Sequence, residues 1–347
     1  MFWNKPRILT IGDTAVDIFI RLQAGDGIRD FDDGDKRELY LDFGKKLPYE
    51  FIETIYGTGN SANAAICSAR LGLDSYLLSH LGDDELSQKC LDQFHHEKIN
   101  TKFIYQHRDK KMKQHFVLWY GQDRTILTRH EQYKYSFPSN IKTPDWIYLS
   151  SIGDGSLAYH IQVAEWLNSH PKTKLVFQPG TFQVKVGYDS LKTIYQHSDI
   201  YISNIEEAES IVGENIVTGG DGKQSQTKRL AEKVASLGPK MVVLTDGPDG
   251  SYVWDNSNND NYTLYFLPQF PSEPALERTG AGDAYSATLM SALALGEKIE
   301  TAMRWASINA SNVCNFVGSQ AGLLHLSEIK KIDQAAAKDW QVTKINI

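Results

Sequence analysis

The feature that most constrains the fold of this chain is the regular alternation of short apolar segments with helical segments from Asp145 onward. Short apolar runs separated by helices are typical of parallel strands buried on both faces, because the crossover connections place helices over the sheet. We therefore predict an α/β fold with a mainly parallel sheet and helices on both faces. The predicted strands here are 146–150, 174–178, 200–203 and 241–244, and the predicted helices are 156–169, 189–197, 204–212, 226–237, 281–295, 301–315 and 327–339.

The N-terminal part extends this alternation but also departs from it. A strand and a hairpin that do not fit it predict a small antiparallel β subdomain, covering about residues 18–56 and 112–133, within a single domain spanning 1–347. The acidic, glycine-rich stretch 23–50 fails the ligand pattern of a calcium loop, so we interpret it as a solvated connection. The segments that fit the alternation are 7–11, 61–71, 75–81 and 84–97, and those that do not are the strand 51–56 and the hairpin 114–129.

Composition and charge exclude several classes of protein. The chain has 347 residues, of which 41% are hydrophobic, enough for a sizeable core. Its net charge of −7 argues against a general nucleic-acid or anionic-membrane binder. No apolar run reaches the roughly 18 residues of a membrane span, and acidic residues interrupt the N-terminal apolar stretch, so we expect no signal peptide. The cysteines are odd in number and scattered, which predicts a reducing, cytoplasmic environment without disulfides: Cys67, Cys90 and Cys314.

The sharpest chemical signal is the loop Arg278–Asp283. Gly280 and Gly282 flank Ala281 immediately before a long apolar helix. Such a loop offers successive backbone N–H groups at the positive end of a helix dipole, which together form an anion hole. The Asp283 carboxylate at its edge can take a proton from a hydroxyl that attacks phosphorus. The alternative is a structural aspartate in a first helical turn, which the dipole alone favours.

Two further motifs lie near the N-terminus. Asp17 comes just after a strand end, where open α/β sheets place ligands, and its carboxylate can accept hydrogen bonds from two hydroxyls of a polyol. The alternative is a surface or capping aspartate. Gly57–Ala62 matches G-x-G-x-x-[G/A], with Asp83 about 20 residues later, so a dinucleotide site is a second interpretation. Against it, this motif does not open the first strand–helix–strand unit of the chain.

Two turns in the second half are also candidates. Asn204 and Glu207 form a capping-box pattern at a strand–helix junction, a structural role that needs no ligand, although a glutamate there can also hold the water shell of Mg²⁺. Thr245–Gly250 is a sharp turn that brings backbone close to a bound nucleotide or only reverses the chain. The sequence has no phosphate-binding P-loop of the form G-x-x-x-x-G-K-[S/T], no G-x-S-x-G and no H-E-x-x-H motif.

Taken in order, these motifs resemble the ribokinase (PfkB) family of carbohydrate kinases from Gly12 to about Gly322. The family's glycine signature D-T-x-G-A-G-D is similar to Glu277–Asp283, with Glu277 and Arg278 in place of its first two residues. The remaining matches are Thr58–Ala65 to G-G-x-x-x-N-x-A, with Thr58 at the first glycine, Asn204 and Glu207 to N-x-x-E, Thr245, Gly247 and Gly250 to T-x-G-x-x-G, and a C-terminal helix 309–318 that ends near a glycine.

The resemblance implies a ribokinase-like three-layer sandwich with a small antiparallel β lid, and ATP-dependent phosphorylation of a sugar hydroxyl with Mg²⁺. The lid would close over the substrate, and in this family it can also pair two subunits, so a homodimer is an expectation. The implied catalytic residues are Asp283 as the base and Gly280, Ala281 and Gly282 as the anion hole. The implied binding residues are Asp17, Gly59 and Asn63 for substrate, Asn204, Thr245, Gly247, Gly250 and Asn309 for ATP, and Glu207 for Mg²⁺ through water.

Some points stay open at this level. The family's leading aspartate helps to bind a monovalent cation, so Glu277 and Arg278 leave potassium dependence undecided, and Ala15 stands where ribokinases carry an asparagine. A nucleoside kinase is the alternative within the same chemistry, with aromatic side chains of the 114–129 hairpin that could stack on a base: Phe116, Trp119 and Tyr120. A nicotinamide-dependent dehydrogenase and an inactive sugar-binding protein are alternatives of other classes, and neither explains Asp283 and its loop.

Overall fold

A ten-stranded sheet runs through the computed structural model, which describes residues 5–25, 27–32, 37–121, 123–129, 131–138, 140–217, 220, 222–256 and 262–345. Neighbouring strands from β7 to β13 are parallel, and the strands from β13 to β16 are antiparallel. The expectation of a mainly parallel sheet is confirmed. In spatial order the strands are β16 (Thr343–Ile345), β15 (Thr263–Leu267), β14 (Ser251–Asp255), β13 (Met241–Thr245), β12 (Ser198–Asn204), β11 (Lys174–Phe177), β10 (Trp146–Leu149), β1 (Arg7–Ile11), β6 (Asp74–Leu81) and β7 (Asn100–Gln106).

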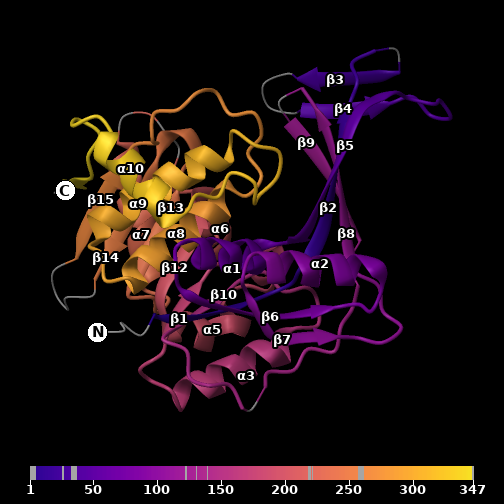
Figure 1. Cartoon of the computed structure of the whole chain (residues 1–347). Coiled ribbons are helices and arrows are strands. Elements are labelled where there is room, and N and C mark those ends of the chain that lie inside the picture. Colours follow the sequence, from indigo (N-terminus) through magenta and orange to yellow (C-terminus); the bar gives the residue numbers. More distant parts are fainter. Residues whose placement is uncertain are drawn as a thin grey trace.

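Helices cover both faces of this sheet (Figure 1), because its strands present apolar side chains alternately to either side. In β10, Tyr148 belongs to one buried cluster and its neighbours Ile147 and Leu149 belong to the other. One face carries α1 (Asn60–Arg70), α2 (Glu85–His96), α8 (Ala281–Ala294), α9 (Ile299–Val313) and α10 (Leu326–Ala335), and the other carries α3 (Leu157–Asn168), α4 (Thr181–Val186), α5 (Tyr188–His197), α6 (Ile205–Val212) and α7 (Lys223–Ala235).

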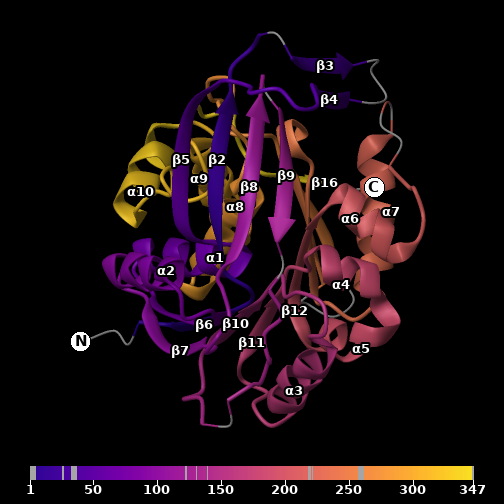
Figure 2. The ribbon, with the colours of Figure 1, turned by 90° about the vertical axis from the view of Figure 1, so that its right-hand side faces the viewer.

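A second sheet of four strands stands beside the main sheet, in the order β5 (Tyr49–Thr58), β2 (Ala15–Leu22), β8 (Lys113–Tyr120) and β9 (Asp123–Arg129), as Figure 2 shows. We call it the small sheet. Its outer pairs are antiparallel, as expected, but its central pair, β2 and β8, is parallel. The physical reason lies in the connections: β2 follows β1 and β8 follows β7, and β1 and β7 already run in the same direction in the main sheet.

The prediction of an irregular connection over 23–50 was wrong in part. This stretch contains a hairpin of β3 (Ile28–Asp32) and β4 (Arg37–Leu41), which lies at the far end of the small sheet in Figure 1. This hairpin has many acidic residues, and Ile28 is the only one of its described apolar side chains that is buried. The sequence therefore lacks a clear strand pattern here. Positions 26 and 33–36 of the stretch lie outside the described residues. The edge strands β7 and β16 were also not predicted.

Candidate active site

Helices α1 and α8 lie side by side with their N-termini at the same end. Asn63 Nδ2 in the first turns of α1 donates a hydrogen bond of 2.8 Å to Asp283 Oδ2 in the first turn of α8. Further along, the hydroxyl oxygens of Ser68 and Ser291 are 3.1 Å apart. Two helix N-termini therefore face one region, and the positive ends of their dipoles favour a negatively charged group there.

The loop that leads into α8 requires a glycine at position 280 but not at position 282. Gly280 has φ +83°, and a Cβ atom at this position would lie 2.4 Å from Ser319 Cβ. At Gly282, by contrast, a Cβ atom would meet nothing within 4 Å among the described residues. The first N–H groups of a helix have no partner within it, although Ala281 N does contact Arg278 O at 3.4 Å. The loop thus packs closely on one side and presents amides at an open surface on the other.

Amide side chains hold the carboxylate of Asp283. Besides Asn63, Gln178 Nε2 donates to Asp283 Oδ1 at 3.3 Å, and the side chain of Asn60 is a third partner. Burial raises the pKa of Asp283 above its ordinary value, and the negative charge of Asp17 raises it further, while the amide hydrogen bonds lower it. Gln178 was not predicted; the available signal was a polar residue directly after the buried strand β11.

Asn63 orients this carboxylate. Its Oδ1 accepts a hydrogen bond from Ser319 Oγ at 3.0 Å and lies 3.3 Å from Gln320 Nε2, and the side chain is buried. Both polar atoms of the Asn63 side chain are therefore engaged by the protein. A direct contact of Asn63 with substrate remains a prediction.

Asp17 and a histidine face each other on the small sheet. Asp17 on β2 is paired in register with His115 on β8, and Asp17 Oδ1 lies 3.0 Å from His115 Nδ1. His115 was not predicted. Gly59, the residue before α1, has φ +106°, and a Cβ atom there would lie 2.6 Å from the carbonyl oxygen of Asp13. Gly59 therefore allows α1 to begin directly against the chain between β1 and β2.

A partly buried charged cluster fixes the base of the small sheet. Asp13 follows β1 and accepts hydrogen bonds from Gly153 N at 2.7 Å and Tyr135 OH at 2.9 Å, and it forms an ion pair with Lys113 of β8. This cluster lies at the carboxyl edge between β1 and β10, the point where the strand order reverses and where open sheets bind ligands. Asp13 was not predicted, although it lies only two residues beyond the predicted strand 7–11.

A cavity of about 700 Å³ lies on the other side of the glycine loop. Its size is that of a site for a small organic molecule. Three residues predicted to bind ATP line it, namely Thr245, Gly247 and Gly250, of which Gly250 has φ +108° and no room for a Cβ atom beside Leu267 O. The opposite wall is formed by Arg278, Ala281 and Gly282 of the loop and by Ser307, Ala310, Ser311 and Cys314 in and after α9.

The structure places Asn309 outside the lining of this cavity. This residue is fully buried in α9, and its Nδ2 donates to Thr288 Oγ1 at 2.8 Å while its Oδ1 accepts from Leu324 N at 2.9 Å. Asn309 therefore faces the helix interface, and the cavity is lined instead by neighbours on the other side of α9, such as Ala310.

Asn204 and Glu207 form the predicted capping box at the start of α6. Glu207 N donates to Asn204 Oδ1 at 2.7 Å and Asn204 N donates to Glu207 Oε2 at 3.1 Å. Asn204 is also paired in register with Thr245, which lines the cavity. Burial raises the pKa of Glu207, and the negative charges of Asp283 and Glu206 raise it further.

The carboxylates of Glu207 and Asp283 suit a divalent cation that arrives with a nucleotide. No group of three or more His, Cys, Asp or Glu side chains that could hold a metal occurs in the part of the chain that the structure describes. Mg²⁺, however, is usually held by one or two carboxylates together with water and substrate phosphates. Burial is the main cause of the raised pKa of Glu207, the negative charge of Asp283 adds to it, and a cation beside Glu207 would offset both effects.

Glu277, where a monovalent cation was left open, already has a cationic partner. Its side chain is buried, its Oε1 accepts hydrogen bonds from Thr279 N at 2.8 Å and Thr279 Oγ1 at 2.5 Å, and it lies 3.4 Å from Nη1 of Arg124. The guanidinium comes from β9 of the small sheet.

None of the helices over the described residues has the length and apolar character needed to cross a bilayer.

Comparison with known proteins agrees with this geometry. The family model described as "pfkB family carbohydrate kinase" matches residues 51–325. A ribokinase of Bacillus subtilis (strain 168) is 25% identical over 298 residues, covering 81% of this chain and 91% of that protein. A nucleoside kinase of Methanothermobacter thermautotrophicus is 24% identical over 330 residues, covering 93% and 94%.

The fold is also that of solved ribokinase structures. The structure of Arabidopsis thaliana ribokinase complexed with ribose and ATP has a TM-score of 0.76 against this chain at 17% identity. The match covers 95% of this chain and 99% of that one. The three-layer sandwich expected from the resemblance is thereby confirmed. The chain belongs to the pfkB family of carbohydrate kinases, ATP-dependent phosphotransferases that act on an alcohol group.

Proposed function

We propose that this protein transfers the γ-phosphoryl group of ATP to a hydroxyl of a sugar, with Asp283 as the general base. The observation that carries the proposal is the position of Asp283. Asp283 lies in the first turn of α8, and its carboxylate is held by Asn63 and Gln178. The amides of the same turn border the 700 Å³ cavity. Base and anion site therefore lie within one helical turn.

In the proposed reaction the acceptor hydroxyl gives its proton to the Asp283 carboxylate while its oxygen forms a bond to the γ-phosphorus. The bond from that phosphorus to the bridging oxygen breaks, and ADP leaves with the electron pair. The backbone N–H groups of Gly280, Ala281 and Gly282 would hold the negative charge of the transferred group, because they are already oriented before the reaction. The raised pKa of Asp283 suits this role, since a stronger base accepts the proton more readily.

For the substrate, we propose binding by Asp17 together with Gly59 and Asn63. Asp17 is almost fully buried beside His115, where a carboxylate is poorly solvated and gains most from the hydroxyls of a polyol. Gly59 would let the sugar approach the backbone closely. The small sheet would act as the lid, excluding water so that ATP is not hydrolysed.

For the nucleotide, we propose the cavity lined by Thr245, Gly247 and Gly250, with Asn204 at its edge. Mg²⁺ would neutralise the phosphate oxygens during transfer. Glu207 would hold its water shell, and the assignment is supported by the negative charge of Asp283, which acts on this carboxylate and raises its pKa.

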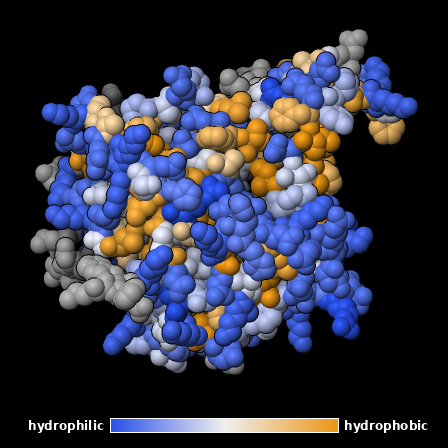
Figure 3. Space-filling view, in the orientation of Figure 1, coloured by the Kyte–Doolittle hydropathy of each residue, from blue (hydrophilic) through white to orange (hydrophobic). Residues whose placement is uncertain are grey.

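We also propose a homodimer formed through the outer face of the small sheet. In β9 the side chains alternate, so Leu127 lies on the face opposite to Arg124, and it is paired in register with Phe116 of β8. Both are exposed, as is Ile52 of β5. Figure 3 shows hydrophobic side chains gathered over the small sheet. Exposed apolar patches of this kind mark association surfaces.

The decisive experiment is a panel of sugars and nucleosides with ATP and Mg²⁺, read by ADP release. A sugar that gives the highest kcat/KM supports the proposal, and a nucleoside would select the alternative within the family. Of the aromatic residues considered for stacking on a base, Trp119 already packs against Arg21 and Phe51. Binding of a sugar without ADP release would indicate an inactive binding protein.

The dehydrogenase interpretation rests on Gly57–Ala62, and the packing offers another reason for these glycines. A Cβ atom at Gly57 would lie 2.6 Å from the Phe94 ring, and one at Gly59 would strike the backbone of Asp13. Hydride transfer to a nicotinamide without ADP release would reverse this conclusion.

A further inference from the structure

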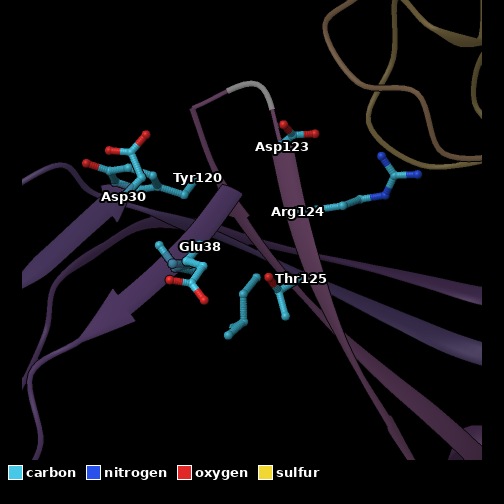
Figure 4. A pocket seen from close by; sticks show the side chains of 8 residues that line it. Asp30, Glu38, Tyr120, Asp123, Arg124 and Thr125 are labelled. Carbon is cyan, nitrogen blue, oxygen red and sulfur yellow. The ribbon is translucent and has the colours of Figure 1, made fainter. Parts of the chain in front are cut away.

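One arginine of the small sheet reaches the loop that carries the proposed chemistry. Arg124 on β9 lies 3.4 Å from Glu277, the residue directly before Arg278–Asp283. The side chain of Arg124 is 28% exposed and that of Glu277 is 3% exposed. Figure 4 shows Arg124 pointing away from Asp30, Glu38 and Tyr120, which line the same small pocket at this end of the sheet. The contact therefore joins the small sheet to the main body.

The register of the small sheet places Arg124 on the face that carries Asp17 and His115. Arg124 is paired with Trp119 of β8, and Trp119 with Arg21 of β2. Asp17 precedes Arg21 by four residues on β2, and His115 precedes Trp119 by four residues on β8. Asp17 and His115 therefore lie on the same face as Arg21 and Trp119. Arg129, also on β9, lies on the opposite face and is exposed.

The pair is only half formed. Among the described residues, neither Arg124 Nε nor Glu277 Oε2 has a hydrogen-bond partner, and both atoms are buried. One is a donor and the other an acceptor, and they belong to the two members of the same pair. Arginine and carboxylate groups pair best through two parallel hydrogen bonds. A small approach of β9 to the loop would satisfy both atoms at once.

Glu277 transmits its position to the loop. Its Oε1 accepts hydrogen bonds from both the backbone N–H and the hydroxyl of Thr279, the residue before Gly280. A buried carboxylate without its cationic partner is strongly unfavourable, so Glu277 would move towards solvent if Arg124 were removed. Thr279 would lose its acceptor, and the amides that follow would lose their fixed orientation.

We propose that Arg124 is a positioning residue for phosphoryl transfer: as the small sheet closes, its guanidinium forms a two-point pair with Glu277 and, through Thr279, fixes the loop that holds the transferred phosphoryl group. Arg124 acts on the loop and does not contact the sugar. The inference rests on the proposed function for its kinetic consequence, but the mechanical link between small sheet and loop is independent of it.

The kinetic test uses Arg124→Ala, Glu277→Gln and the double variant, with Arg129→Ala as the matched control on the same strand. We expect each single change to lower kcat by about tenfold, and the double variant to be no slower than the slower single one, because both changes remove one interaction. The KM of the sugar should change by less than about threefold. Arg124→Lys keeps the charge without the two-point geometry and should recover part of kcat.

Additive losses in the double variant, a rise in sugar KM with kcat intact, or an equal loss in Arg129→Ala would each overturn the proposal. Because Glu277→Gln removes a buried charge and could disturb folding, its urea midpoint is measured first. If it does not fold, the two Arg124 variants and the exchange measurement below decide the question.

The second test is hydrogen exchange in the full chain without ligands. Arg124→Ala should increase the exchange rate of the Thr279 amide, which donates to Glu277, while the exchange rates of amides within α9 stay unchanged. In Arg129→Ala the exchange rate of the Thr279 amide should equal that of the wild type. Unchanged exchange at Thr279 would contradict the link. If the wild-type protein shows no kinase activity, the proposed function fails, whereas this measurement still reports on the link itself.

Discussion

Asp283 has to be negatively charged to accept a proton, although burial opposes its charge. Asp283→Asn keeps the shape of the side chain and removes the base, so we expect kcat to fall by about 10²- to 10⁴-fold. Removal of the buried charge stabilises the folded protein, whereas the new NH2 group cannot accept the hydrogen bond that one oxygen of Asp283 accepts from Asn63 or Gln178, so we expect the free energy of unfolding to change little at neutral pH. Stopped-time assays of ADP release and urea unfolding measure the two effects, and wild-type turnover in this variant would refute the assignment of the base.

The raised pKa of Asp283 sets the acid limit of activity. The folded pKa lies above the unfolded one, so protonation is favoured by folding, and activity is lost as pH falls through the raised value. Because the charge of Asp17 contributes to this shift, Asp17→Asn should move the acid limb of kcat/KM to lower pH while it raises the sugar KM.

The control for this pH prediction is Asp92→Asn, the same change at an exposed position on α2. Its acid limb should coincide with that of the wild type. A limb that stays in place in Asp17→Asn would show that the two carboxylates are not coupled.

At the scale of elements, α9 tests how a motif is translated into a site. Asn309 bonds to Thr288 and Leu324 inside the protein, so Asn309→Ala should lower the free energy of unfolding by about 1–3 kcal/mol and leave the KM of ATP unchanged. Ala310→Leu on the cavity side should leave the free energy of unfolding nearly unchanged and raise the KM of ATP. A raised KM for ATP in Asn309→Ala would instead support the ATP-binding role that the sequence predicts for this residue.

Elements with a local signal could be predicted, and those that depend on partners could not. The start of α6 is set within its own first turn by Asn204 and Glu207, and the turn at Gly250 is set by its own backbone. The hairpin β3–β4 and the parallel pairing of β2 with β8 depend on how distant segments meet, which no window of sequence contains.

The same division applies to the candidate site. The sequence pointed to Asp283 and Asp17 because each is a polar residue next to an apolar strand or helix. It could not show that Gln178 and Asn63 hold Asp283, or that Arg124 pairs with Glu277, since these partners come from other elements. Asp13 was within reach, because its position after a buried strand was known, but its partners were not.

At the scale of the whole molecule, the proposed site is assembled from two bodies. Asp17 and Arg124 belong to the small sheet, whereas Asp283 and Glu277 belong to the main body. The ion pair of Asp13 with the buried Lys113 fixes the base of the small sheet, so any closing motion would pivot near that point. Substrate binding and loop positioning would then respond to the same movement.

The proposed dimer can be tested through the outer face of the small sheet. Leu127 is 52% exposed there, and burying a leucine contributes about 1.5–3 kcal/mol, a contribution that a two-fold interface contains twice. Leu127→Lys should therefore shift the protein to monomers in sedimentation equilibrium, whereas Ile161→Lys, at an exposed position on α3, should not. A wild-type protein that stays monomeric at all concentrations, or a dimer unaffected by Leu127→Lys, would exclude this face, and the apolar side chains of the small sheet would then need another partner.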